Sequence, residues 1–175
     1  MRKQKGFSLI ELLIVVAIIL IIAAIAIPNL LRSRIAANEA SAVGTVRTVT
    51  TAQVTYMSAY YTVGYADTLA KLGPKAAPCD ATGACLIDGV VGCAAQPCRK
   101  SGYMFELAAA AIAPATVPNT YVISAYPEVK GTTGERVFCS VEDGVVRSDP
   151  AAAGGGPIAH DTCGDNAGTW VPINQ

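Results

Sequence analysis

One uninterrupted apolar run near the N-terminus dominates the hydrophobic pattern of the chain. No charged residue occurs from Leu12 to Leu31. A transmembrane helix needs about 20 predominantly apolar residues, and this run supplies them. The pattern therefore predicts a helix that can enter a membrane, although a carboxylate, Glu11, stands at its beginning. Burying an ionised acid in hydrocarbon costs roughly 2.5–3.5 kcal/mol on insertion scales, so Glu11 needs an explanation.

A helical pattern continues beyond the apolar run. Apolar side chains and one threonine recur mostly at steps of three or four residues, and we expect them on the buried face: Ile35, Val43, Val46, Thr50, Val54, Met57 and Tyr60. Asn38, Glu39, Arg47 and Gln53 fall at other positions around the helical wheel. Gly64 is the predicted terminator, because glycine commonly follows the last turn of a helix.

A helix from Phe7 to about Tyr60 would be roughly 80 Å long at 1.5 Å per residue. One small domain cannot bury that length, so the first half must find lipid or other copies of the chain. Pro28 lacks an amide donor and clashes with the preceding turn, and should kink or loosen the helix.

The remainder of the chain alternates loops with short strand-like stretches. Residues 62–100 form a connection rich in Gly, Pro and Cys, and residues 150–175 form a Gly/Pro-rich tail. Four strands are predicted between them, at Gly102–Leu107, Thr120–Tyr126, Arg136–Val141 and Val145–Ser148. Asp143-Gly144 between the last two is a tight-turn signal. The prediction is an α+β fold in which the long helix packs on a four-stranded antiparallel sheet.

Composition restricts the possible functions. The 175 residues suffice for one domain plus an extra element, and 52% of them are hydrophobic. Basic and acidic side chains balance at 13 each, but Arg2, Lys3 and Lys5 all precede the apolar run. The rest therefore carries a net charge of −3, which does not suit a protein that coats nucleic acid or an anionic membrane surface. No nucleic-acid site is evident.

Six cysteines lie beyond the apolar segment, at 79, 85, 93, 98, 139 and 163. An even number confined to one part of an exported chain indicates disulfides. No C-x2-C pair occurs and there is a single histidine, so zinc is not expected. Fifteen pairings are possible. We favour Cys139–Cys163, which would tie the tail to a strand, with Cys79–Cys85 and Cys93–Cys98 closing short local loops.

A search for catalytic chemistry finds none. The sequence has no G-x-S-x-G elbow and no phosphate-binding G-x-x-x-x-G-K-[ST] loop. His160 beside Asp161 is expected to be a solvated loop pair. Asp161, Asp165 and Asn166 are a weak calcium candidate that departs from the EF-hand spacing. We expect neither an enzyme nor a cofactor.

Residues 1–31 admit three interpretations. They can be a plain transmembrane anchor, a signal peptide cleaved after Ala24-Ile25-Ala26, or the leader and first helix of an N-methylated pilin precursor. The stretch MRKQKG/FSLIELLIVVAIILIIAAIAIPNLL resembles the N-terminus of type IV pilins and type II secretion pseudopilins. Gly6 matches the residue before prepilin-peptidase cleavage, Phe7 the N-methylated first residue, Glu11 the acid at mature position five, and Pro28 the helix-interrupting proline.

The resemblance, most like a type IVa major pilin, implies a pilin fold. Residues 1–6 would be the leader, 7–31 the protruding membrane and assembly half of the helix, 32–61 its amphipathic half, and 62–175 a globular domain with its sheet at 101–149. The segment GTTGERVF, at 131–138, is a weaker match to sheet regions of bacterial pilins.

The same resemblance implies a function in assembly. The chain would wait in the inner membrane with its globular domain in the periplasm, be cut by prepilin peptidase, and join a helical homo-oligomeric filament through an assembly platform. Phe7, Glu11 and Pro28 would act in that assembly, which would serve adhesion, motility or DNA uptake. The alternatives are a type II secretion pseudopilin and a minor pilin or membrane-anchored binding module.

Overall fold

The computed structural model of the protein describes residues 8–150, 156–164 and 170–173. The chain divides into two compact units, Met1–Arg34 and Ile35–Gln175, which we treat separately. The first helix, α1 (Leu9–Ala59), contributes its N-terminal half to the first unit and its C-terminal half to the second. The boundary lies three residues after the end of the apolar run.

Helix α1 continues through Pro28 without a break and ends at Ala59, five residues before the turn at Gly64. The backbone amide of Gly64 donates to the carbonyl of Tyr60 at 3.2 Å. Gly64 has a φ of +83°, and a Cβ there would overlap the carbonyl of Pro118. The turn after the helix therefore requires glycine for both its conformation and its close approach.

The buried face of α1 differs from the predicted one. The side chains that become buried are Glu39, Ala42, Thr45, Val46, Val49, Ala52, Gln53 and Tyr56. Val46 was predicted correctly, but Val54 is 53% exposed, and Glu39 and Gln53, which were placed at other positions around the wheel, are buried. The prediction was wrong because it counted apolar side chains alone, whereas these two polar side chains satisfy their hydrogen bonds inside the domain.

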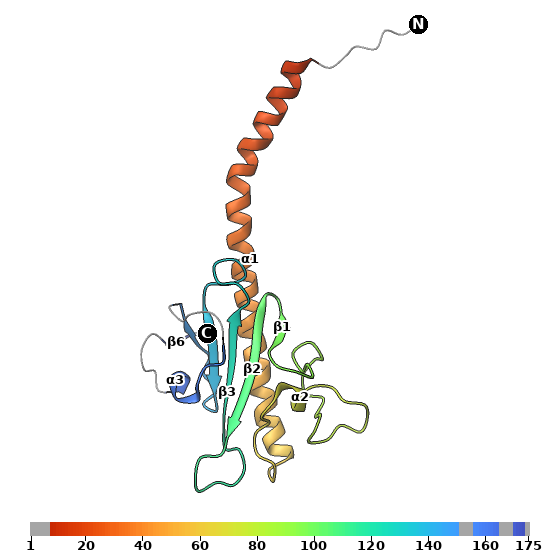
Figure 1. Cartoon of the computed structure of the whole chain (residues 1–175), viewed down its shortest axis with the longest axis vertical. Coiled ribbons are helices and arrows are strands. Elements are labelled where there is room, and N and C mark those ends of the chain that lie inside the picture. Colours follow the sequence, from red (N-terminus) through yellow and green to blue (C-terminus); the bar gives the residue numbers. More distant parts are fainter. Residues whose placement is uncertain (1–7, 151–155, 165–169, 174–175) are drawn as a thin grey trace. The chain divides into compact units, whose positions relative to one another are not determined.

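The second unit contains a single antiparallel sheet whose six strands follow one another in sequence order. The strands are β1 (Cys98–Lys100), β2 (Tyr103–Ala110), β3 (Thr120–Pro127), β4 (Val137–Val141), β5 (Arg147–Asp149) and β6 (Val171–Pro172). In the centre of the sheet, the register pairs Phe105 of β2 with Ala125 of β3, and Ser124 of β3 with Cys139 of β4. Figure 1 shows this sheet lying against the C-terminal half of α1.

The predicted α+β class and antiparallel sheet are confirmed, but the strand count was low. Strands β2 to β5 correspond to the four predicted ones with shifted ends. Two edge strands were missed, because β1 has three residues and β6 only two. Segments this short carry no alternating pattern and become strands only by pairing with a longer neighbour.

The sheet is covered on both faces. On the α1 face, Val46, Val49 and Tyr56 belong to one apolar cluster with Phe105 and Ile123. On the other face, a smaller cluster holds Val122, Tyr126, Val137, Cys139, Val141, Cys163 and Trp170. Short helix α3 (His160–Gly164) lies on this second face, so the predicted tail contains a helix and a strand.

The long connection before the sheet contains one short helix, α2 (Leu69–Leu72), whose two end residues are buried in the main core. Disulfides Cys79–Cys85 and Cys93–Cys98 close loops within this connection, and Cys139–Cys163 joins β4 to α3. The amide side chain of Gln96 accepts from the Leu107 amide at 2.8 Å and donates to its carbonyl at 3.0 Å. The connection is thereby fixed to the edge of β2.

Candidate functional site

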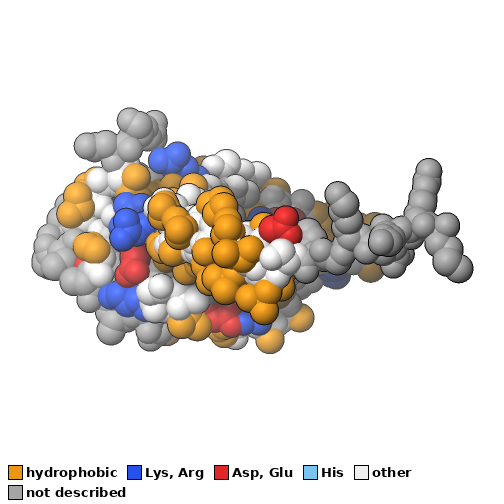
Figure 2. All heavy atoms as spheres, turned by 90° about the horizontal axis from the view of Figure 1, so that it is seen from above, with side chains coloured by type: hydrophobic (Ala, Val, Ile, Leu, Met, Phe, Trp, Pro, Cys, Tyr) orange, Lys and Arg blue, Asp and Glu red, His pale blue; other side chains and the backbone are white. Residues whose placement is uncertain are grey.

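The N-terminal half of α1 exposes an apolar surface along its whole length. Every large apolar side chain from Leu9 to Leu31 is exposed, from 46% at Val16 to 79% at Leu9. Figure 2 shows these side chains gathered over the N-terminal part of the helix. By length and composition α1 is able to cross a membrane. Such a surface must be covered, by lipid or by protein, because water does not solvate it favourably.

Glu11 caps the beginning of this helix. The backbone amide of Ser8 donates a hydrogen bond to Glu11 Oε2 at 2.9 Å. Ser8 precedes the first helical residue and Glu11 stands three positions later, which is the spacing of a capping box. Within the described residues, Glu11 Oε1 makes no hydrogen bond or ion pair. One carboxylate oxygen of Glu11 therefore accepts a hydrogen bond within its own helix, and the other oxygen has no partner among the described residues.

Of the other residues predicted to act in processing and assembly, the structure describes only Pro28. Gly6 and Phe7 lie outside the described residues. Pro28 lies within α1. Arg32 and Arg34 follow the apolar run and make no ion pair with the residues that the structure describes. A positive charge therefore closes the apolar segment at its C-terminal end.

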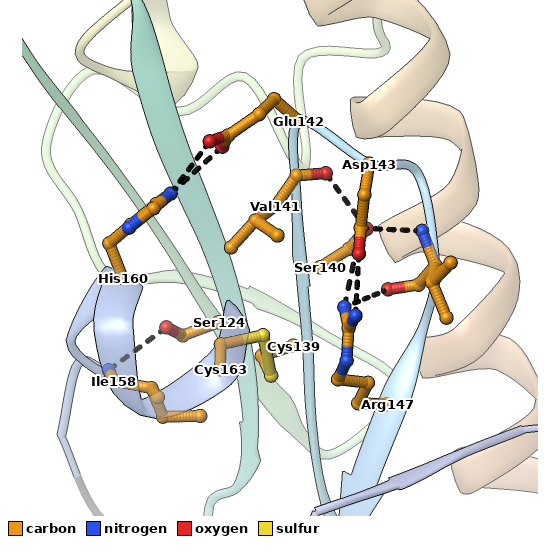
Figure 3. The surroundings of a disulfide bond; sticks show 11 residues. Ser124, Cys139, Ser140, Val141, Glu142, Asp143, Arg147, Ile158, His160 and Cys163 are labelled. Carbon is orange, nitrogen blue, oxygen red and sulfur yellow. Dashed lines mark hydrogen bonds and ion pairs between the residues drawn. A yellow bond between two sulfur atoms is a disulfide. The ribbon is translucent and has the colours of Figure 1, made fainter. Parts of the chain in front are cut away.

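A second candidate region surrounds His160 on α3. His160 Nε2 lies 2.9 Å from both carboxylate oxygens of Glu142, in the β4–β5 turn, and Nδ1 lies 3.1 Å from Asp161 Oδ1. Figure 3 shows that this contact and the Cys139–Cys163 disulfide both hold α3 against the sheet. Partial burial by itself lowers the pKa of His160, but hydrogen bonds to Asp161 and Glu142 outweigh it, so the pKa lies above 6.5.

Sequence reasoning placed His160 in a solvated pair with Asp161 and missed Glu142, which is 18 residues away. Only the sheet brings those two side chains together. Of the calcium candidates, Asp161 contacts His160, while Asp165 and Asn166 lie outside the described residues. Among the described residues, no group of three or more His, Cys, Asp or Glu is placed to hold a metal ion.

Several tyrosines lie near the C-terminal end of α1. Tyr56 is buried, contacts Tyr60 at 5.0 Å between ring centroids, and donates from its hydroxyl to the carbonyl of Ala81 at 2.6 Å. Tyr65 packs edge-on against Tyr121 of β3 at 4.8 Å. Tyr61, by contrast, is 77% exposed. These rings are mainly part of the core.

Comparison with known proteins points to the N-terminal segment. A family model for the prokaryotic N-terminal methylation motif matches residues 1–27. The chain is 67% identical over 39 residues to the type IV wide pilus major component PilA4 of Thermus thermophilus, a match covering 22% of this chain and 30% of that protein. It is 45% identical over 56 residues to the type IV major pilin protein PilA of Myxococcus xanthus, covering 32% of this chain and 26% of that protein.

These matches span less than a third of the length of either curated relative. No solved structure matches the chain. The globular unit is thus described by its own structure rather than by similarity. The chain therefore resembles type IV major pilins in its N-terminal segment, which carries the methylation motif and continues as the exposed apolar helix.

Proposed function

We propose that the chain is a structural subunit of a type IV pilus, which polymerises through the N-terminal half of α1 into a surface filament. The observation that carries this proposal is the apolar surface of Leu9–Leu31, exposed on every side of the helix. Burial of apolar surface contributes about 25 cal/mol per Å², so covering it with neighbouring helices would supply most of the adhesion. Adhesion, motility and DNA uptake are the uses that such a filament would serve.

The order of events follows from the chemistry of the N-terminus. Prepilin peptidase would cut between Gly6 and Phe7, and the new amine of Phe7 would be N-methylated. The precursor pool would lie in the inner membrane with the globular unit in the periplasm. An assembly platform would then extract subunits into an extracellular filament, with Pro28 as a weak point at which the helix can loosen.

Glu11 would select the docking register. Its Oε2 is occupied by the Ser8 amide, and Oε1 is open within the described part of the chain. An unpaired carboxylate in the apolar centre of a filament is costly, whereas one paired with the Phe7 amine of a neighbouring copy is tolerated. The pair would therefore contribute specificity rather than net adhesion.

The test separates the charge of Glu11 from its capping role. Glu11→Gln retains a side-chain oxygen that accepts from the Ser8 amide but removes the charge, whereas Glu11→Ala removes both. We expect both variants to insert and be cleaved, and both to reduce filament yield at least about tenfold, since losing a buried pair exceeds 1.4 kcal/mol. Yield is measured on sheared surface filaments by electron microscopy, with mass spectrometry of the subunit and its N-terminus.

Thr51→Ser, on the exposed face of α1, is the control and should assemble normally. Normal assembly of Glu11→Gln beside a defective Glu11→Ala would show that Glu11 acts only as a cap. Normal yield from both variants would refute any assembly role. Absence of this subunit from wild-type surface filaments would instead favour a secretion pseudopilin or a minor pilin.

A further inference from the structure

The first side chain of α1 to become buried in the globular unit is a carboxylate. Counting from Ile35, where that unit begins, Glu39 is 7% exposed, and the next buried residue is Ala42. Helices generally dock through apolar residues, because burying a charge is favourable only when it is fully paired. The position of Glu39 therefore calls for a specific role.

Glu39 is fully paired with the loop before β4. Its Oε1 accepts from the backbone amides of Glu135 at 3.0 Å and Arg136 at 3.2 Å. Its Oε2 accepts from Arg136 Nε at 2.9 Å and Nη2 at 2.7 Å. Charge-assisted bonds of this kind are roughly twice as strong as neutral ones. We call Glu39, the Glu135 amide and Arg136 the Glu39 clamp.

The loop that receives Glu39 is held in place independently. The Tyr103 hydroxyl donates to the carbonyl of Arg136 at 2.9 Å, and the Arg136 guanidinium lies 5.4 Å from the centroid of the Phe138 ring. A Cβ at Gly134 would overlap the Tyr103 ring, so only glycine permits this approach. The clamp thus joins α1 to the loop that leads into β4, across 97 residues of sequence.

One further polar contact to the same loop is made by the residue directly before Glu39. Asn38 Nδ2 donates to the carbonyl of Thr133 at 2.9 Å. Between Arg32 and Ala37, the described hydrogen bonds of α1 are its own backbone ladder and the Ser33 hydroxyl on the carbonyl of Asn29. Helical amides without tertiary support open at low free energy, whereas those beneath buried contacts open only with the domain.

We propose that the Glu39 clamp is the stop that limits unwinding of α1 from its N-terminal side. Fraying, or extension under load, that begins near Pro28 can spread through residues 29–37 and halts where the clamp holds the helix. The part of α1 from Ala42 to Tyr56 then stays on the sheet. This stop is a property of the single subunit and does not depend on the proposed function; in a filament it would fix how much of α1 can extend.

Hydrogen exchange with mass spectrometry on the full chain in detergent micelles tests this. In the wild type we expect slow exchange within the micelle-covered apolar run and fast exchange at residues 32–41. A step to slow exchange should follow at residues 42–43, because each helical amide bonds to the carbonyl four residues earlier. Glu39→Ala should accelerate exchange at residues 42–45 by about 10- to 100-fold, the range for losing hydrogen bonds to a charged group. Residues 49–56 should be unchanged.

Glu39→Gln and Arg136→Lys are milder variants that keep the test valid if Glu39→Ala does not fold. Each should move the step toward Val46 by a smaller amount. Glu135→Gln is the matched control, because its exposed side chain lies outside the clamp while its backbone amide remains. Unaltered exchange in the Glu39 variants, equal acceleration along all of α1, or no step in the wild type would each overturn the proposal.

Discussion

At the scale of single residues, the informative side chains are carboxylates and amides in unexpected surroundings. Glu11 caps an apolar helix, Glu39 is buried beneath a loop, and Gln53 is fully buried in the core. In each case the polar group stands where it can satisfy backbone amides that would otherwise lack partners. An unsatisfied buried amide costs about 1–3 kcal/mol, so these side chains stabilise through the groups they contact.

Gln53 makes this argument testable. Its Oε1 accepts from the Ala66 amide at 2.9 Å and its Nε2 donates to the Ala66 carbonyl at 2.7 Å. Gln53→Leu should leave both backbone groups unpaired and lower the free energy of unfolding by about 2–4 kcal/mol. Thermal unfolding followed by circular dichroism measures the loss. Thr55→Val on the exposed face is the control, and an equal loss in both variants would contradict the assigned role.

At the scale of elements, the C-terminal segment is attached by several contacts of different chemistry. The Cys139–Cys163 disulfide joins α3 to β4, and the Ile158 amide donates to Ser124 Oγ on β3 at 3.0 Å (Figure 3). Beside them, the buried guanidinium of Arg147 on β5 binds Asp143 at 2.5 Å, which orders the β4–β5 turn that carries Glu142. The ion pair between His160 and Glu142 is the pH-sensitive contact of this group.

The pH dependence follows from the direction of the His160 shift. Its pKa is raised above 6.5 in the folded protein, so the ion pair stabilises fully below about pH 6.5 and is lost as the pH rises through the folded pKa. His160→Gln should therefore lower the melting temperature by about 2 °C at pH 5.5 and hardly at all at pH 9, as for a partly exposed pair. Differential scanning calorimetry at both values measures it.

Glu142→Gln removes the partner from the other side and should show the same pH dependence. A His160→Gln effect of equal size at both pH values would mean that packing, not charge, attaches α3. The raised pKa would then have no consequence for stability.

At the scale of the whole molecule, the chain combines two units that differ in how they are stabilised. The unit from Ile35 onward has its own apolar clusters on both faces of the sheet and three disulfides. The unit from Met1 to Arg34 has no buried apolar cluster within its described residues. Its helix must therefore be stabilised by its surroundings.

This difference predicts the behaviour of a truncated chain. Residues 35–175 alone should be soluble without detergent, remain monomeric at micromolar concentration and keep all six cysteines oxidised. Removal of the exposed apolar helix should change the melting temperature of the globular unit by less than about 4 °C, the shift for 1 kcal/mol or less. Light scattering coupled to size exclusion, together with thermal unfolding, checks both points.

The full chain in detergent is the reference for that comparison. Aggregation of residues 35–175, or a much lower melting temperature, would show that the globular unit relies on the first half of α1.

The sequence by itself determined the local features: the apolar helix, its acid at Glu11, the α+β class and the approximate places of four strands. These follow from composition and periodicity, which act over neighbouring residues. The tertiary structure decided which face of α1 is buried, that Glu39 and Gln53 lie inside, and that β1 and β6 are strands. It also brought Glu142 to His160 and Arg136 to Glu39. Those outcomes depend on hydrogen-bond partners up to 97 residues distant, and no local pattern records them.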